Sequence, residues 1–286
     1  MIKPFIKFIS RCFNSSSFIR KVCELIINVR SFENNNFLKS SYTSRANLVK
    51  ELHSSFEKRK LTHAKENITS SQVKKKFNHL RRFADDFILS YAKIFKPKTI
   101  LQLGCWHMGE ILILKSFGFK GNLVASDQST EFLEILREKY KNTFLKNVIY
   151  KKFDIENPNI AVLKDVQMIS AIQVLSNIQP EGIESFFKVL SNSSVRILII
   201  GDMFTDNSLS GSFELSKKNL NWNHPYIRLS KKNNLDCFFL PDISFSNIDE
   251  RRGVFIISKK IGNSIHREVM AEACQNFIKR QLNFLS

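Results

Sequence analysis

The stretch Thr99–Asp127, TILQLGCWHMGEILILKSFGFKGNLVASD, contains the pattern that decides the fold. It opens with an apolar run, Thr99–Leu103, which is typical of a buried strand and is followed directly by Gly104. A second apolar run, Asn122–Ser126, ends on the carboxylate of Asp127. The residues between the two runs are typical of a short helix. The stretch therefore predicts a strand–helix–strand unit of a parallel sheet.

The ends of these two strands suit a nucleoside-bearing cofactor. The turn with Gly104 and Gly109 lets a ligand approach bare backbone, because glycine carries no side chain. Asp127 can accept hydrogen bonds from the hydroxyl groups of a ribose. The turn lacks the GxGxxG spacing of dinucleotide oxidoreductases. A phosphate-binding loop needs Lys and Ser or Thr after its second glycine, where this chain has Glu110-Ile111.

Residues 98–261 alternate between strand and helix patterns. Alternation of this kind predicts an α/β fold, in which a seven-stranded, mostly parallel, doubly wound sheet is covered by helices on both faces. The last two strands are joined by the loop Pro241–Arg252, without a helix, and are expected to pair antiparallel. The expected strands are 99–103, 122–126, 147–153, 166–172, 196–201, 235–240 and 253–259, and the expected helices between them are 109–117, 129–140, 180–191 and 223–233.

Two further helices are expected to flank this region. One spans Ser71–Phe95 and ends at Lys96-Pro97, because the residue before a proline is disfavoured in helical conformation. Its apolar and aromatic side chains repeat at helical spacing, which indicates a core face rather than a ligand site. The other spans about 265–284, and its apolar face is expected to hold Val269, Ala273, Phe277 and Leu282.

The chain of 286 residues is long enough for one α/β domain with an added segment. We expect a basic helical N-terminal extension over residues 1–68 and the α/β domain over residues 69–286. The net charge is +18, and residues 1–95 hold nineteen Lys and Arg against seven Asp and Glu. This imbalance favours an anionic partner such as phospholipid, nucleic acid or a phosphorylated substrate. A solvated basic face without a dedicated partner is an equal alternative.

Residues 1–30 carry an apolar stripe beside lysines, which favours either peripheral association with a membrane surface or packing on the main domain. No apolar run approaches the roughly 20 residues that span a bilayer. The five cysteines are widely spaced and odd in number, without CxxC pairs or zinc-ligand spacing, so no metal site is expected. A cytoplasmic location, at the inner membrane face if residues 1–30 bind lipid, fits best. Residues 1–32 are also rich in Arg and Ser, so an organellar transit peptide is the alternative.

At this point the chain resembles the class I S-adenosylmethionine-dependent methyltransferases over roughly residues 72–261. Their first motif is an apolar strand, an acid and a GxGxG-like turn, and here it is Leu101-Gln102-Leu103-Gly104-Cys105-Trp106-His107-Met108-Gly109. Gly104 matches the first glycine and Gly109 a later one. The usual acid is Gln102, which cannot offer a carboxylate to the cofactor's ammonium group, and Trp106 replaces the middle glycine.

The resemblance implies S-adenosyl-L-methionine as the cofactor and a Rossmann-like sheet with its last strand inserted antiparallel. It assigns Asp127 to the ribose and Asp154, after the third strand, to the adenine amino group. The end of the fourth strand, with Gln173, is expected to line the methyl-transfer face. The cofactor-binding set is then Gln102, Gly104, Cys105, Gly109, Asp127, Gln128, Asp154, Ile155 and Gln173.

Methyl transfer to an oxygen can require a base, and two candidates follow the later strands. They are Asp202, in Gly201-Asp202-Met203, and His224, in Asn223-His224-Pro225. The alternative for His224 is a helix cap or a surface position. After the fourth strand, Ser176-Asn177-Ile178-Gln179 stands where nucleic-acid amino methyltransferases usually carry an Asn/Asp-Pro-Pro-Tyr/Phe-like motif.

The predicted function is methylation of a small hydroxyl acceptor, such as a glycan or a lipid-linked sugar. This acceptor fits a basic, amphipathic N-terminus at a membrane face. Three alternatives stay open: an RNA methyltransferase, a protein methyltransferase, and a catalytically degenerate methyltransferase-like binding or scaffold protein. The last of these follows from Gln102 and Trp106 in the cofactor turn.

Overall fold

The computed structural model describes residues 83–106, 108–216, 221–242, 252–259 and 263–284. All of them belong to the second of two units into which the chain divides, Asn35–Ser286. The predictions for residues 1–68 and for the first part of the helix 71–95 lie outside the described residues. The boundary between extension and α/β domain stays a prediction.

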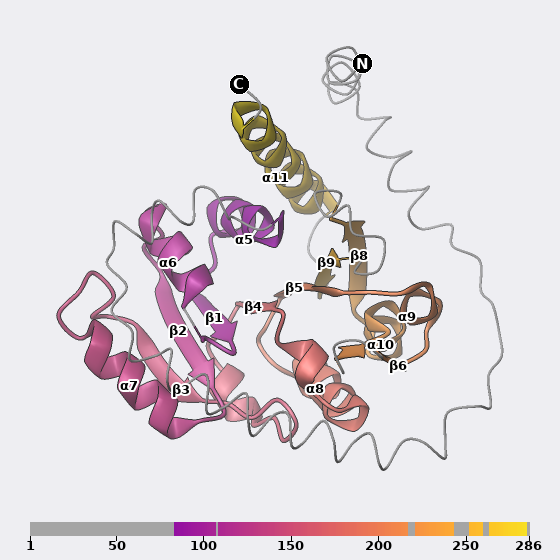
Figure 1. The fold of residues 1–286 in the computed structure, drawn as a ribbon, viewed down its shortest axis with the longest axis horizontal. Helices are drawn as coiled ribbons and strands as arrows, with labels where there is room; N and C mark the ends of the chain where they lie inside the picture. The colour runs from indigo at the N-terminus through magenta and orange to yellow at the C-terminus, as the bar shows by residue number, and fades with distance from the viewer. Residues whose placement is uncertain (1–82, 107, 217–220, 243–251, 260–262, 285–286) are drawn as a thin grey trace. The chain divides into compact units, whose positions relative to one another are not determined.

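Seven strands form one sheet in the order β3-β2-β1-β4-β5-β9-β8. Strands β1 to β5 pair in parallel, and β9 is inserted antiparallel between β5 and β8 (Figure 1). The predicted seven-stranded sheet and the antiparallel pairing of the last two strands are confirmed. The bounds are Thr99–Leu103 (β1), Asn122–Asp127 (β2), Ile149–Lys152 (β3), Met168–Ile172 (β4), Ile197–Met203 (β5), Asp236–Pro241 (β8) and Arg252–Ser258 (β9).

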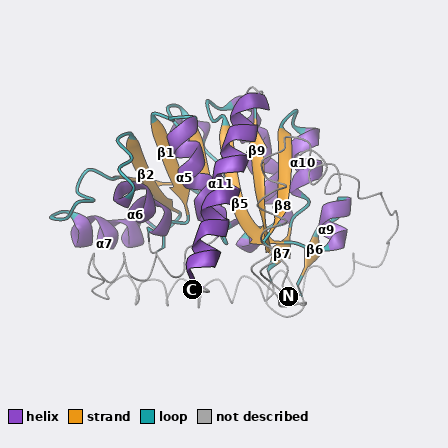
Figure 2. Cartoon of the chain, turned by 90° about the horizontal axis from the view of Figure 1, so that it is seen from above, coloured by secondary structure: helices purple, strands orange, loops and turns teal. Residues whose placement is uncertain are grey.

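Helices cover both faces of this sheet. Figure 2 shows α5, α6 and α11 in front of the strands and α10 behind them. Helix α8 packs beside α10, because the rings of Phe187 and Tyr226 stack with their centroids 6.2 Å apart. The bounds are Phe83–Ile94 (α5), Gly109–Ser116 (α6), Thr130–Tyr140 (α7), Pro180–Asn192 (α8), Asp206–Ser210 (α9), Tyr226–Lys232 (α10) and Asn263–Phe284 (α11), with short 3-10 turns at Ile160–Leu163 (η1) and Leu175–Asn177 (η2).

The central strands are buried along their whole length. Every residue of β1 and β4 is buried, and so are the first six of β5. Apolar side chains of α8, including Phe186, Phe187 and Leu190, pack against them on one face. Burying one such side chain stabilises the fold by about 1.5–3 kcal/mol. The continuous apolar runs in the sequence therefore correspond to strands that are covered on both faces.

The other face is closed by α5 and α11. The α5 side chains Phe87 and Tyr91 are fully buried, which confirms the predicted core face of this helix. The Tyr91 hydroxyl lies 2.6 Å from Nδ1 of His266, whose Nε2 lies 3.2 Å from Oγ of Ser258. This chain of hydrogen bonds joins α5, α11 and β9. It provides partners for polar groups that would be costly to bury alone.

The structure differs from the sequence-based prediction around Trp222–Asn223. These residues form a short strand, β7, which pairs antiparallel with β6, Glu214–Leu215. Helix α10 starts only at Tyr226 and not at residue 223. The physical reason is Pro225, which disfavours helical conformation in the residue before it. His224 therefore lies in the link between β7 and α10.

No helix in the described part of the chain is both long and apolar enough to cross a membrane.

Helix α5 packs closely against the sheet at Gly201 of β5. A Cβ atom at Gly201 would lie 2.9 Å from Cβ of Ala84 and 3.0 Å from Cδ1 of Ile172. We expect Gly201→Ala to lower the free energy of unfolding by about 1–3 kcal/mol, because the added methyl group overpacks the core. Urea unfolding followed by circular dichroism measures this change.

A double-mutant cycle with Ala84→Gly provides the control. Removing the Ala84 methyl group makes room at Gly201, so we expect a favourable coupling of about 1 kcal/mol between the two substitutions. Strictly additive effects would contradict the predicted contact.

Candidate cofactor and acceptor site

The predicted site residues lie at one edge of the sheet. Strands β1, β2, β4 and β5 are parallel, so their carboxyl ends meet there. Gly104 follows β1, Asp127 ends β2, and Gln173 follows β4. Strand β9 runs the opposite way, so its first residue, Arg252, lies at the same edge, opposite Met203 of β5. In folds of this type ligands bind outside the carboxyl ends of the strands.

The turn after β1 depends on two residues with left-handed backbone. Gly104 has φ 58°, and a Cβ atom there would lie 2.7 Å from Cγ2 of Val174. Only glycine combines this conformation with so close an approach. The second left-handed residue is Met108, with φ 51°, whereas Gly109 is the first residue of α6. The predicted helix 109–117 thus begins where expected, and the place of Gly109 in the cofactor-binding set stays a prediction.

Gln102 is a buried residue of β1 and connects it to α6. Its Oε1 accepts a long hydrogen bond, 3.4 Å, from the backbone N–H of Ile111, and its carbonyl oxygen accepts from Oγ of Ser126 at 2.9 Å. Cys105 is also buried, and its backbone N–H donates to the carbonyl oxygen of Ser126 at 3.0 Å. In this structure both residues therefore support the turn that Gly104 begins.

Asp127 is a buried carboxylate at the end of β2, with 3% of its surface exposed. Its Oδ1 accepts from the backbone N–H of Ser129 at 3.1 Å. Oγ of Ser129 in turn caps α7 by accepting from the N–H of Phe132 at 3.2 Å. The next residue, Gln128, is exposed. The carboxylate thus has a structural role at the start of α7 as well as the position predicted for a ribose partner.

Asp154 follows β3 and binds mainly its own loop. Its Oδ1 accepts from the N–H of Glu156 at 2.9 Å, and its Oδ2 accepts from Nδ2 of Asn157 at 3.0 Å. Ile155 beside it is 7% exposed and belongs to the apolar core. The adenine contact of Asp154 stays a prediction, and each of its two carboxylate oxygens already has a partner in the loop.

Asp202 connects three elements at the site. Its Oδ2 accepts from the N–H of Ser176 at 3.0 Å and from the hydroxyl of Tyr226 at 2.9 Å. Its Oδ1 accepts from the N–H of Met203 at 2.9 Å. The side chain is 2% exposed. Burial raises the pKa of Asp202 to about 6, although these hydrogen bonds favour the charged form.

His224 is also buried, with 1% of its surface exposed. Its Nε2 lies 2.8 Å from the carbonyl oxygen of Leu175 in η2. Burial lowers the pKa of His224 to about 4, while the carbonyl groups of Leu175 and Ile178 favour the proton. The imidazole is therefore neutral at pH 7, and Nε2 donates its hydrogen to Leu175.

Asp202 and His224 together hold the loop after β4. Asp202 binds the N–H of Ser176, and His224 binds the carbonyl oxygen of Leu175. The sequence pointed to the two polar residues, but it did not indicate Tyr226 or Ser176 as their partners. These contacts join segments far apart in the chain, so no local pattern marks them. The catalytic assignment of Asp202 and His224 stays a prediction, and their burial favours a role in positioning the loop.

Gln173 and Arg252 form a contact that the sequence did not indicate. Gln173 is exposed, has φ 57°, and donates its backbone N–H to the carbonyl oxygen of Gly201 at 2.8 Å. With its amide oriented to suit its neighbours, its side-chain oxygen accepts from Nη1 of Arg252 at 3.0 Å and from Nη2 at 3.3 Å. Arg252 can be recognised as a neighbour of Gln173 only once β9 is paired with β5.

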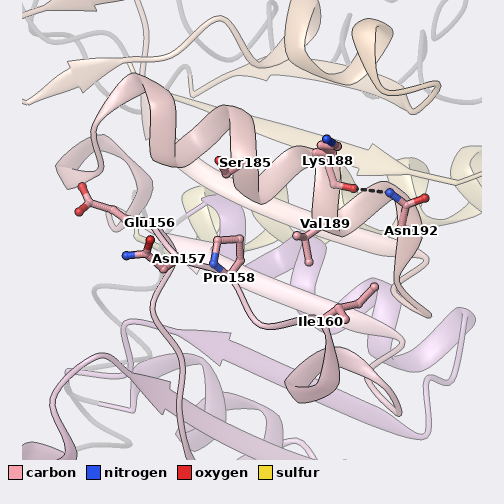
Figure 3. A pocket seen from close by; sticks show the side chains of 8 residues that line it. All are labelled: Glu156, Asn157, Pro158, Ile160, Ser185, Lys188, Val189 and Asn192. Atoms are coloured by element: carbon pink, nitrogen blue, oxygen red, sulfur yellow. Dashed lines mark hydrogen bonds between the residues drawn. The ribbon is translucent and has the colours of Figure 1, made fainter.

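A shallow pocket of about 520 Å³ lies elsewhere, between the loop after β3 and α8 (Figure 3). Its lining includes Glu156 and Ile160 from the loop and Lys188 from α8. None of the predicted site residues lines it. In the part of the chain that the structure describes, no group of three or more His, Cys, Asp or Glu side chains could hold a metal ion.

The buried carboxylate of Asp202 predicts a specific pH dependence of stability. Because the pKa of Asp202 is raised in the folded state, the folded protein binds more protons than the unfolded one between about pH 4 and 6. The contribution of Asp202 to stability therefore falls as the pH rises through this range. His224 contributes the opposite slope, because its pKa is lowered from 6.5 to about 4.

Asp202→Asn removes the contribution of Asp202 to stability, which falls as the pH rises, and leaves the contribution of His224 in place. We compare the free energy of unfolding of this variant with that of the natural protein. We expect the difference, variant minus natural protein, to rise by about 2–3 kcal/mol from pH 4 to pH 7. Urea unfolding at pH 4, 5, 6 and 7 measures the difference, with the exposed Asp165→Asn as the control for loss of a carboxylate. A difference that stays constant with pH would contradict the burial of a charge at Asp202.

Comparison with known proteins assigns the chain to a family. The family model described as "Tellurite resistance protein TehB" matches residues 64–227, more than half of the chain. A comparison with curated proteins finds no match.

Several solved structures are similar to this chain. Magnesium protoporphyrin IX methyltransferase from Synechocystis PCC 6803 with bound S-adenosylhomocysteine is 11% identical, with a TM-score of 0.51 over 75% of this chain and 100% of that one. The methyltransferase domain of bacterial CtHen1 is 14% identical, with a TM-score of 0.49 over 62% of this chain and 98% of that one. A methyltransferase from Clostridium acetobutylicum ATCC 824 is 14% identical, with a TM-score of 0.45 over 62% and 90%.

At 11% identity, the likeness to magnesium protoporphyrin IX methyltransferase shows the fold alone. The family match has a different weight, because it covers most of the α/β domain, from before α5 to the start of α10. It confirms the resemblance stated from the sequence, together with the enzyme class and the cofactor, S-adenosyl-L-methionine. The chain belongs to the TehB family of S-adenosylmethionine-dependent methyltransferases.

Proposed function

We propose that this methyltransferase methylates an oxygen of a small hydroxyl-bearing acceptor, such as a glycan or a lipid-linked sugar. The observation that carries this proposal is the fixed loop after β4, where Ser176 and Leu175 are held by Asp202 and His224. This loop follows the strand that the family uses to line the methyl-transfer face. A rigid wall of this kind suits a small acceptor that must be held in line with a methyl group.

The residues of the turn fit the cofactor in two respects. Gly104 lets the turn after β1 close against Val174, where a side chain has no room, and Asp127 places a carboxylate at the end of the neighbouring strand. We assign Asp127 to the ribose, and Gln128 and Ile155 to the adenine. When bound, S-adenosylmethionine supplies an activated methyl group on its sulfonium. The protein then has to hold the acceptor in line and to exclude water.

Asp202 and His224 contribute by positioning rather than by taking a proton from the acceptor. Both side chains are almost fully buried, and Asp202 already accepts from Ser176, Met203 and Tyr226. A base that meets an acceptor must come within hydrogen-bond reach of its hydroxyl group. The two residues instead keep the loop after β4 in place beside Gln173.

The sequence of residues 1–30 also fits the proposed acceptor. Their apolar stripe and lysines suit a membrane surface that carries lipid-linked sugars. A cytoplasmic protein at the inner membrane face would meet such acceptors. RNA and protein acceptors are the competing possibilities, and the end of β4 lacks the Pro-Pro motif expected for nucleobase methylation.

The carboxylate of Asp127 can be tested by cofactor binding. We expect Asp127→Asn to weaken the binding of S-adenosylhomocysteine by about 1–3 kcal/mol, which corresponds to roughly 5- to 150-fold in Kd, because charge-assisted hydrogen bonds to the ribose are lost. Titration calorimetry measures both proteins. Asn retains an oxygen that can accept from the N–H of Ser129.

Ser129→Ala is the matched control for this test. It removes the cap of α7 and leaves the carboxylate of Asp127 in place. We expect it to cost about 1 kcal/mol of stability and to leave the affinity for S-adenosylhomocysteine unchanged. Equal affinities of the natural protein and Asp127→Asn would remove Asp127 from the site.

The acceptor class is tested with S-adenosylmethionine carrying a labelled methyl group. We expect incubation with fractionated cell envelope to transfer label to the glycan or lipid-linked sugar fraction, in alkali-stable ether linkage. Total RNA, total protein and tellurite, to which the family's name refers, are assayed in parallel. Label that enters one of these three and not the glycan would contradict a sugar hydroxyl as acceptor.

A further inference from the structure

The hydroxyl group of Tyr226 connects helix α10 to the carboxylate of Asp202. It donates to Oδ2 of Asp202 at 2.9 Å, and the same oxygen accepts from the backbone N–H of Ser176 at 3.0 Å. Burial raises the pKa of the Tyr226 hydroxyl group well above its usual value, and the carboxylate beside it acts in the same direction. The hydroxyl group therefore keeps its proton and remains a donor to Asp202.

The ring of Tyr226 is held in place without its hydroxyl group. It stacks on the ring of Phe187 in α8, with the centroids 6.2 Å apart, and packs edge-on against the ring of Phe255 in β9 at 4.9 Å. Only 1% of Tyr226 is exposed. These contacts are apolar, so a phenylalanine at this position would keep them. The hydroxyl group thus has a separate effect, which is to direct one oxygen of Asp202.

The loop after β4 is anchored to β5 on both sides of Val174. Before Val174, the N–H of Gln173 donates to the carbonyl oxygen of Gly201 at 2.8 Å. After Val174, the N–H of Ser176 donates to the carboxylate of Asp202. The position of Val174 therefore depends on both hydrogen bonds, and the second of them depends on the direction of a carboxylate.

Val174 in turn packs against the turn that follows β1. A Cβ atom at Gly104 would lie 2.7 Å from Cγ2 of Val174 and 2.9 Å from Cγ1, so the valine side chain closes on the backbone of this turn. A shift of Val174 would change the space in which the turn lies. The contacts thus form a continuous path from Tyr226 through Asp202 and Val174 to the turn to which we assign the cofactor.

We propose that Tyr226 is a positioning residue for methyl transfer: its hydroxyl group directs the carboxylate of Asp202, which keeps Val174 against the turn that binds the cofactor. Hydrogen bonds and packed side chains carry energetic coupling between separate parts of a site in this way. The inference rests on the proposed function in one respect, because it assumes that the cofactor binds at the turn after β1.

The test measures the binding of S-adenosylhomocysteine to the full-length protein by titration calorimetry at pH 6.5, 7.5 and 8.5. We expect Tyr226→Phe to raise Kd by about three- to ten-fold at pH 7.5, because a hydrogen bond to a charged group is lost. The pKa of Asp202, about 6 in the natural protein, rises in this variant, since the hydroxyl group favours the charged form. The ratio of the two Kd values, variant over natural protein, is therefore expected to fall as the pH rises.

The other titratable groups on the elements around Asp202 are the same in both proteins. The ring of His224 lies 5.6 Å from that of Tyr226, and burial lowers the pKa of His224 to about 4, so this imidazole is neutral over the whole range. Arg252 lies at the start of β9, and the N–H of Asp242 donates to its carbonyl oxygen. Because these groups are present in both proteins, their effects cancel in the ratio.

Tyr91→Phe is the matched control, because it also removes the hydroxyl group of a buried tyrosine. This hydroxyl group lies 2.6 Å from Nδ1 of His266. Nε2 of His266 lies 3.2 Å from Oγ of Ser258, which pairs with Ile197 at the amino end of β5, away from the turn after β1. We expect this variant to bind S-adenosylhomocysteine like the natural protein at all three pH values.

A second variant tests the path through the loop. Val174→Ala removes the methyl groups that close on the turn at Gly104. In this background we expect Tyr226→Phe to change Kd by less than about two-fold, because residues that act through one contact are not additive.

The outcomes separate this inference from the proposed function. Failure of the natural protein to bind S-adenosylhomocysteine at all would overturn the proposed function. Normal binding that Tyr226→Phe leaves unchanged, or a loss of affinity that Tyr91→Phe matches, would overturn the inference alone. A ratio that stays constant with pH, or a full effect of Tyr226→Phe in the Val174→Ala protein, would also overturn it.

Discussion

The carboxylate of Asp202 is the polar interaction on which the arrangement of the site depends. Asp202 lies near the end of β5. Its carboxylate accepts hydrogen bonds from the N–H of Ser176, in the loop after β4, and from the hydroxyl of Tyr226 in α10. Burying a carboxylate is costly, and the three donors around it offset that cost only in this arrangement. His224 completes the hold on the same loop through Leu175. The loop therefore has one position relative to β5, and Gln173 and Arg252 are placed beside it.

The turn after β1 keeps its path although its sequence departs from the family pattern. Gly104 takes a left-handed conformation against Val174, and Met108 takes a second one directly before α6 begins at Gly109. Met108 is fully buried, so its packing offsets the strain of its backbone. Gln102, in place of the usual acid, binds the first turn of α6. Gln102 departs from the family pattern, which suggests a degenerate cofactor site. In the structure the turn is nevertheless held by the packing of Met108 and by the hydrogen bond of Gln102.

Much of the fold was predictable, because it follows from periodicity within short segments. The apolar runs that predicted β1, β2 and β4 are strands buried on both faces, and the alternation of strands and helices indicated a parallel sheet. The start of α10 was predicted wrongly, since Asn223 belongs to β7 and the helix begins only after Pro225, at Tyr226. Of the site, Gly104 and Asp127 were recognisable from their places at strand ends. The partners of Asp202 and the contact of Arg252 with Gln173 were not.

By itself, the sequence determined the α/β class, the order of the seven sheet strands along the chain, the glycine turn after β1 and the family resemblance, because each of these depends on neighbouring residues. Only the tertiary structure decided what Asp202 and His224 do, since their burial and their partners come from strands and helices far apart in the chain. It also brought Arg252 to the edge of the sheet where Gln173 follows β4. A side chain's pKa and reach are set by what surrounds it, and those surroundings exist only after the strands have paired.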